Sequence, residues 1–133
     1  MGFFRLLPTV GRSTALPLQS LYLPSNKRLL PVMRYISTHL CDNLTIERVA
    51  AELGFSVRTL SRMFSNERLR FSSYVNYQRI TRAIELIAAR DKTLQEIAYE
   101  VGFNTPNNFT RVFKHLMGVS PSTFCKGTRV TEV

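Results

Sequence analysis

Apolar residues recur at intervals of three and four positions from about residue 30 onwards, which is the spacing of one buried face of an α-helix. The clearest stretch is formed by Ile46, Val49, Ala50 and Leu53. No segment alternates between apolar and polar residues as a half-buried strand would. The pattern predicts an all-α domain over residues 30–128, with a tail or linker over 1–29 and a short tail over 129–133.

The residues that favour helix ends divide this domain into helices. The expected spans are 31–40, 46–53, 57–65, 73–89, 94–101, 105–117 and a short last helix from Ser120-Pro121 to Gly127. Thr45 and Ser56 are placed to cap the second and third helices through their side-chain oxygens. Thr93 with Glu96 has the capping-box spacing, and Asn104 is expected to cap the next helix.

The helices form a repeat in which a short helix, a glycine break and a second helix occur twice. Thr45 matches Thr93 and Gly54 matches Gly102, each 48 positions later. After one inserted residue the match continues at 49 positions, pairing Leu60, Arg62 and Phe64 with Phe109, Arg111 and Phe113. This arrangement is typical of a helix-turn-helix unit, in which the first helix braces the second so that its free face can enter a DNA major groove.

The free faces of the two second helices carry residues that can bond to base edges. Opposite the apolar stripe lie Arg58, Ser61, Arg62 and Ser65 in the first unit, and Asn107, Thr110, Arg111 and Lys114 in the second. Arginine can bond bidentately to guanine and asparagine to adenine. Because the faces differ, the two half-sites should differ too. The alternative is that these are ordinary solvated helix faces.

The charge of the chain favours an anionic partner. The net charge is +9, and the segment 56–90 holds seven basic residues against two acidic ones. A basic excess concentrated in one segment favours nucleic acid over a membrane surface. The bridging helix over 73–89 spans roughly 25 Å, so with its flanking units it could hold two reading helices near one DNA turn apart, roughly 34 Å. Because the bridge is a helix rather than a flexible loop, we expect the DNA to bend to meet both reading helices.

Other classes of function find little support. The two cysteines, Cys41 and Cys125, and the two histidines have no metal-ligand spacing, and no nucleophile–base constellation is visible. We therefore expect no enzyme, no metal and no cofactor. The phenylalanines fall at core spacing rather than on a surface for base stacking, which makes an RNA-binding or protein-interaction helical module the weaker hypothesis.

The compartment follows from what the chain lacks. No apolar run approaches the roughly 20 residues of a membrane span, and the apolar N-terminal stretch is broken by Pro8, Gly11 and Arg12, so a secretion signal is rejected. We expect a cytoplasmic protein, associated with the nucleoid when bound to DNA, with no membrane partner.

Residues 30 to 127 resemble the DNA-binding domain of the AraC/XylS family of bacterial transcription regulators. The resemblance is carried by "LTIERVAAELGFSVRTLSRMF", "RITRAIELI" and "EIAYEVGFNTPNNFTRVFKHLMGVSPSTF". It implies a seven-helix, two-lobed domain whose third and sixth helices read DNA. By motif position, the base-contacting candidates are Arg58, Ser61, Arg62, Asn107 and Arg111. Candidates for backbone contact are Ser56, Arg68, Arg70, Asn104 and Lys114.

The sequence departs from the family pattern at two places. Pro106 stands where the family often has a polar reading residue, so the second unit is expected to make fewer direct base contacts. The turn after Phe64 lacks the usual glycine and holds Arg68 and Arg70, which predicts an altered end of the helix and added phosphate contact.

The resemblance also bears on partners. It implies double-stranded DNA as partner, as the free helix faces do, and activation through contact with RNA polymerase. The oligomeric state is left open, with a monomer expected for this chain alone. A stand-alone regulator and the DNA-binding fragment of a larger effector-responsive regulator both remain open.

Overall fold

The computed structural model describes the backbone of residues 24–132 and the side chains of residues 24–126. Residues 1–23 of the expected tail over 1–29, the rejected secretion signal and the side chains of the C-terminal tail lie outside these residues. The described part contains helices and no strand, which confirms the all-α prediction. The helices are α2 (Leu29–Thr38), α3 (Ile46–Leu53), α4 (Val57–Asn66), α5 (Phe71–Ala89), α6 (Leu94–Glu100), α7 (Pro106–Met117) and α8 (Pro121–Glu132).

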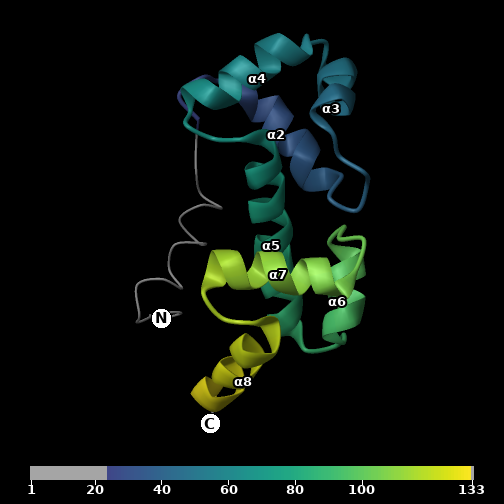
Figure 1. Cartoon of the computed structure of the whole chain (residues 1–133), viewed down its shortest axis with the longest axis vertical. Coiled ribbons are helices and arrows are strands. Elements are labelled where there is room, and N and C mark those ends of the chain that lie inside the picture. Colours follow the sequence, from purple (N-terminus) through teal and green to yellow (C-terminus); the bar gives the residue numbers. More distant parts are fainter. Residues whose placement is uncertain (1–23, 133) are drawn as a thin grey trace.

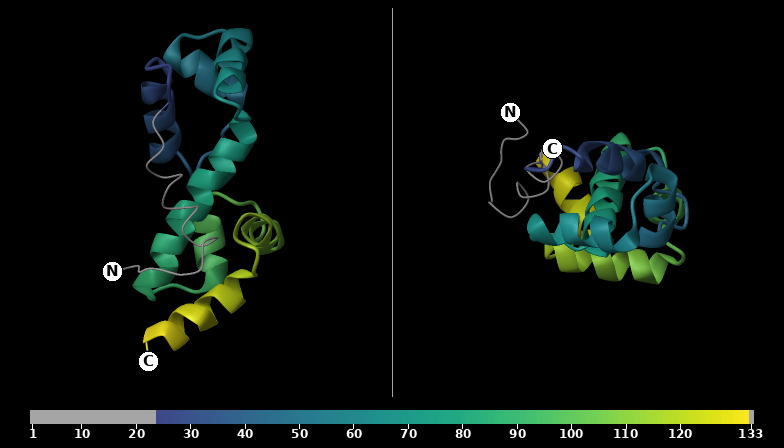
Figure 2. Two further views of the ribbon diagram at one scale, coloured as in Figure 1. Left: turned by 90° about the vertical axis from the view of Figure 1, so that its left-hand side faces the viewer. Right: turned by 90° about the horizontal axis from the view of Figure 1, so that it is seen from above.

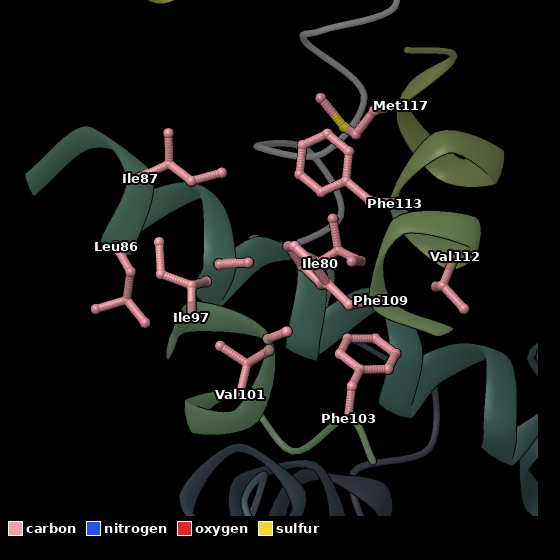
Figure 3. Close-up of a cluster of buried hydrophobic side chains, with 12 residues drawn as sticks. Ile80, Leu86, Ile87, Ile97, Val101, Phe103, Phe109, Val112, Phe113 and Met117 are labelled. Atoms are coloured by element: carbon pink, nitrogen blue, oxygen red, sulfur yellow. The ribbon is translucent and has the colours of Figure 1, made fainter. Parts of the chain in front are cut away.

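The protein has two separate hydrophobic cores, one near each end of α5, and α5 lies along the long axis of the molecule (Figure 1). The first lobe consists of α2, α3, α4 and the start of α5, and its core includes Leu60, Phe64 and Val75. The second lobe consists of α6, α7, α8 and the rest of α5, and its core includes Ile80 and Phe113 (Figure 3). The predicted stripes supply most of both cores because each helix buries only its apolar face.

The predicted N-caps at Thr45, Ser56 and Thr93 are confirmed by hydrogen bonds of their side chains. The side chain of Thr45 accepts the amide hydrogen of Arg48 at 3.1 Å, and Ser56 accepts that of Thr59 at 3.1 Å. Thr93 and Glu96 form the full capping box, and the hydrogen bond that Glu96 accepts from the Thr93 amide lowers the pKa of the Glu96 carboxyl. These bonds satisfy amide groups that a first turn leaves without a helical partner.

One predicted cap is wrong. The N-cap of α7 is Thr105 rather than Asn104, because Thr105 Oγ1 accepts the amide hydrogen of Asn108 at 3.1 Å. Pro106 then occupies the first helical position, where its missing N–H is not needed and its fixed φ suits the helix. Asn104 lies outside the helix with an exposed side chain.

Other helix boundaries differ from the predicted ones by a few residues. Both α2 and α5 begin two residues earlier than predicted, at Leu29 and Phe71. The last helix continues past Gly127 to Glu132, because a glycine costs a helix only about 1 kcal/mol and ends it only when the backbone leaves the helical region. In the stripes, Leu86 and Met117 are buried, whereas the expected Ile84 and Leu116 are half-buried.

The predicted altered end of α4 takes an ordinary form. Arg68 adopts a φ of +60°, the left-handed conformation that glycine would take most easily. The amide of Leu69 donates to the Phe64 carbonyl at 3.0 Å and the amide of Arg68 donates to Ser65 at 2.9 Å, which closes the helix. Arg68 thus takes the left-handed backbone conformation that a glycine usually adopts at a helix end, at some cost in backbone strain.

Replacing Arg68 by Gly is therefore expected to raise the free energy of unfolding by roughly 0.5–1 kcal/mol, the relieved left-handed strain minus the added entropy of the unfolded chain. Chemical denaturation measures the change. Arg70→Gly is the control, because Arg70 has a φ of −102° and carries no such strain. An equal or larger gain for Arg70→Gly would contradict the assignment of strain to Arg68.

Candidate nucleic-acid interface

Each lobe contains a helix, a glycine turn and a second helix, as the repeat predicted. In the first lobe, Gly54 ends α3 with a φ of +79°, and Ser56, two residues later, caps α4. In the second lobe, Gly102 follows α6 with a φ of +106°, and α7 begins at Pro106. Both turns are tight, so α3 packs against α4 and α6 packs against α7. This packing leaves one face of α4 and one face of α7 without a helix against it.

The two second helices lie on the same side of α5. Seen along the direction of Figure 2 (left), α4 and α7 are both viewed nearly end-on, one above the other beside α5. They therefore run in similar directions across the molecule. A single face of the protein presents both helices, which is the arrangement that two consecutive major grooves on one side of a duplex require.

The predicted base-reading residues of the first lobe all lie on the free face of α4. Arg58, Ser61 and Arg62 are exposed, and Ser65 follows them on the same face. The opposite face of α4 buries Leu60, Met63 and Phe64 in the first core. No acidic side chain lies within α4, so its free face combines positive charge with hydroxyl groups and carries no negative charge.

The corresponding residues of the second lobe are also exposed on α7. Asn107, Thr110, Arg111 and Lys114 point away from the core that holds Phe109 and Phe113. The structure adds a residue that the sequence reasoning missed. Asn108 accepts a hydrogen bond from the Arg111 guanidinium, three residues further along the helix. This bond restrains the arginine before any ligand arrives, and the i, i+3 spacing of the two residues is a signal that could have revealed it.

The predicted backbone-contacting residues are more scattered. Ser56 uses its hydroxyl within the helix cap, where it accepts from the Thr59 amide and donates to the Thr59 hydroxyl at 2.8 Å. Arg68 and Arg70 are exposed in the turn between α4 and α5, and Lys114 is exposed in the last turn of α7. Asn104 is exposed beside the N-terminus of α7 without capping it.

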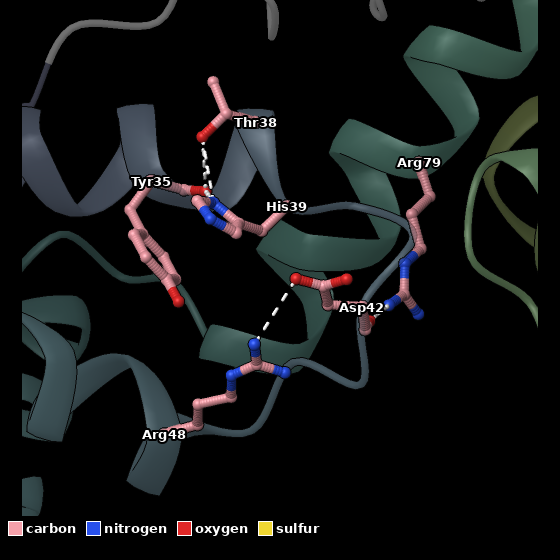
Figure 4. Close-up of polar contacts among 6 residues, drawn as sticks. All are labelled: Tyr35, Thr38, His39, Asp42, Arg48 and Arg79. Atoms are coloured by element: carbon pink, nitrogen blue, oxygen red, sulfur yellow. Dashed lines mark hydrogen bonds and ion pairs between the residues drawn. The ribbon is translucent and has the colours of Figure 1, made fainter.

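A second residue that the sequence reasoning missed is Arg79, one of the seven basic residues of the segment 56–90. Its side chain is half-buried where α5 passes from one core to the other, and it donates to backbone carbonyls of the loop between α2 and α3 (Figure 4).

Other kinds of site are not supported in the described part of the chain. Among residues 24–126, no cluster of histidine, cysteine and acidic side chains has the arrangement needed to hold a metal ion. None of the helices within residues 24–132 combines the length and apolarity needed to cross a membrane.

Curated relatives share the described domain. Residues 49–127 match the family described as "Helix-turn-helix domain". The regulatory protein PocR of Salmonella typhimurium is 31% identical over 102 residues, and the arabinose operon regulatory protein of Escherichia coli is 34% identical over 111 residues. These matches cover 76% and 82% of this chain but 34% and 38% of the relatives. The chain therefore spans about a third of the length of these relatives.

Solved structures show the same fold. The C-terminal domain of AraT, a response regulator from Geobacillus stearothermophilus, matches with a TM-score of 0.72 at 33% identity, over 77% of this chain and 86% of that one. The DNA-binding domain of the global transcriptional factor AdpA, solved in complex with a target DNA, matches with a TM-score of 0.72 at 26% identity, over 78% of this chain and 95% of that one. This chain belongs to the AraC/XylS family of helix-turn-helix transcription regulators.

Proposed function

We propose that the chain binds double-stranded DNA sequence-specifically, with α4 and α7 in two adjacent major grooves, and so regulates transcription. The observation that carries this proposal is the placement of both helices on one side of α5, each with a free polar face (Figure 2). The net charge of +9 supports it, because neutralising phosphates releases counterions and supplies most of the sequence-independent affinity.

Within this proposal the exposed residues divide into two roles. Contacts to base edges come from Arg58, Ser61 and Arg62 on α4, and from Asn107 and Arg111 on α7. Contacts to the phosphate backbone come from the exposed side chains of Arg68, Arg70, Asn104 and Lys114, with Ser56 contributing through the N-terminus of α4.

Pro106 opens α7 without an N–H, so the second lobe depends more on Asn107 and on the Arg111 guanidinium that Asn108 restrains. The first lobe therefore carries the larger share of direct base readout.

The chain acts in the cytoplasm, as an activator that contacts RNA polymerase, and binds DNA as a monomer. Activation is favoured by the names of relatives such as the HTH-type transcriptional activator RhaS of Salmonella arizonae, 29% identical over 126 residues.

A second candidate function is favoured by the length comparison. Because the chain spans about a third of its curated relatives, it could serve as the DNA-binding part of a larger effector-responsive regulator with little specificity of its own.

The experiment that separates these functions is selection of bound duplexes from a random DNA pool at near-physiological salt, with the full chain. Enrichment of a site with two dissimilar blocks about one helical turn apart supports two reading helices on one protomer. A one-block site would restrict base readout to one lobe. Salt-sensitive binding to any duplex, without enrichment, would favour the second candidate function.

Within the enriched site, Arg62→Ala is expected to cost about 1–3 kcal/mol of binding and to relax the base preference at one position. Lys114→Ala should weaken binding to all sequences alike and reduce the slope of affinity against salt by about one unit. Both changes replace exposed side chains, so the fold is expected to be unaffected. Fluorescence anisotropy on matched and mutated duplexes measures the difference, and unchanged base preference in Arg62→Ala would contradict the proposed reading face of α4.

A further inference from the structure

The side chain of Arg79 contacts both lobes at the point where α5 leaves one core and enters the other. Val75 belongs to the first core and Ile80 to the second. Arg79 Nη2 donates to the Asp42 carbonyl at 3.0 Å (Figure 4), and Arg79 Nε donates to the Leu40 carbonyl at 3.2 Å. Both acceptors lie in the loop that joins α2 to α3. The same guanidinium lies over the ring of Phe103, 5.7 Å from its centroid, in the second lobe.

The second lobe approaches this loop directly through the turn after α6. The backbone at Gly102 is so close that a Cβ there would lie 1.9 Å from the Leu40 carbonyl oxygen and 2.8 Å from Arg79 Nε. Beside it, the Cys41 thiol donates to the Glu100 carbonyl at 2.7 Å. We call the loop 40–42, the turn 100–103 and Arg79 together the junction.

The junction is a second attachment between lobes that α5 already joins. The helix pairs with substantial contact in the described chain lie within one lobe or include α5. One continuous helix connects two bodies but leaves them free to bend and twist about it by small amounts. A second attachment away from its axis removes that freedom, because two bodies held at two points cannot rotate independently.

The hydrogen bonds of Arg79 hold its partly buried guanidinium in one position. Burial lowers the pKa of the Arg79 guanidinium, partly offset by the neighbouring Cys41, so its charged form has lost part of its hydration. Two backbone carbonyls replace that water, and the planar fork of an arginine suits two acceptors held side by side. Loss of the side chain would remove both hydrogen bonds together with the contact to Phe103.

We propose that Arg79 is a positioning residue that holds α4 and α7 at a fixed distance and rotation, and thereby sets the base-pair spacing between the two halves of the DNA site. The part that concerns DNA rests on the function proposed above. The part that concerns the fixed orientation of the lobes does not depend on DNA and is tested without it.

The first test measures the orientation of the lobes in the full chain by residual dipolar couplings of backbone amides. The comparison uses Arg79→Met and the control Arg82→Met, which lies on the same helix and replaces an exposed arginine whose guanidinium pairs with Glu85 at 2.9 Å. In the wild type and the control, amides of both lobes should fit one alignment tensor. In Arg79→Met each lobe should still fit its own structure, but with a tensor of different magnitude and direction.

A shared alignment in Arg79→Met, identical to that of the wild type, would overturn the proposal. Arg79→Lys guards against a variant that fails to fold, because it keeps the charge but loses the fork. In Arg79→Lys we expect the alignment tensors of the two lobes to differ by less than in Arg79→Met. If Arg79→Met is unfolded and both lobes of Arg79→Lys still share the wild-type tensor, Arg79 is a structural residue and its positioning role is overturned.

The second test uses the duplex enriched by selection, with its two blocks at the selected spacing and at one base pair more or less. One base pair rotates a block by roughly 35° about the duplex axis. The wild type and Arg82→Met should prefer the selected spacing by about tenfold or more. In Arg79→Met, affinity for the selected spacing should fall about tenfold and the preference should shrink to about threefold or less, because loosely joined sites have a lower effective concentration but tolerate more geometries.

The outcomes of this test separate the two proposals. A wild type whose lobes share one alignment tensor but which binds all spacings equally overturns the two-groove function. A wild type whose lobes need separate tensors overturns the positioning role of Arg79, whatever spacings it binds. A wild type that discriminates, beside an Arg79→Met variant that discriminates equally well, overturns the role of Arg79 alone.

Discussion

Replacing Gly102 by Ala is expected to lower the free energy of unfolding by about 3 kcal/mol or more. Two costs add at this position. Its φ of +106° lies beyond the left-handed region that alanine can reach at a cost of about 1–2 kcal/mol. The new methyl group would also lie 1.9 Å from the Leu40 carbonyl oxygen, and moving backbone to relieve overpacking costs roughly 1–3 kcal/mol. Chemical denaturation measures the loss.

The repeat provides a matched control for this prediction. Gly54 occupies the equivalent position in the first unit with a φ of +79°, but nothing lies within 4 Å of a Cβ placed there. Gly54→Ala should therefore cost only the backbone strain, about 1 kcal/mol. Equal losses for the two variants would show that the contact between turn 100–103 and loop 40–42 contributes nothing to stability.

Phe113→Ala is expected to lower the free energy of unfolding by about 3–5 kcal/mol, the usual cost of removing a phenylalanine from a packed core. Phe113 is fully buried beside Phe109 (Figure 3), with the two ring centroids 5.7 Å apart. Its ring centroid also lies 5.5 Å from that of Phe124. Because the two cores are separate, the loss of protection should concentrate in one lobe. Hydrogen exchange should accelerate most in α6 and α7 and least in α3.

Phe64→Ala is the reciprocal control in the first core, where Phe64 is 1% exposed. It should give a similar loss of stability with the opposite distribution, fastest in α3 and α4. Uniform acceleration of exchange over both lobes in both variants would mean that the domain opens as one cooperative unit, and the description of two independent cores would then be wrong.

The parts of the fold that sequence reasoning reached depend on local interactions. The caps at Thr45 and Thr93 and the glycine at the end of α3 are decided by residues within four positions of each other, so their signals survive in a single sequence. Buried faces follow from the helical period. The exposure of the predicted reading residues follows from the same period, whereas their contacts to bases stay predictions.

The errors arose where neighbouring signals compete or where distant parts of the chain meet. Asn104 and Thr105 can both cap a helix, and the choice between them depends on which one lets Pro106 take the first helical position. The bonds of Arg79 span 37 and 39 positions of sequence, and that of Cys41 spans 59. No periodicity records such contacts, so the junction between the lobes is visible only in the folded chain.

The unlike free faces of α4 and α7 give the molecule a polarity. The described domain presents arginines and serines at one end of α5 and asparagine, threonine and lysine beside an arginine at the other, in an order that no rotation of a single chain reverses. A palindromic site has the same sequence in both directions and cannot orient a protein. A chain with two unlike reading helices needs an asymmetric site, which it binds in one orientation only. Inverting the site within a longer DNA would therefore leave the affinity unchanged, but it would reverse the direction in which the first lobe lies relative to the second along the DNA.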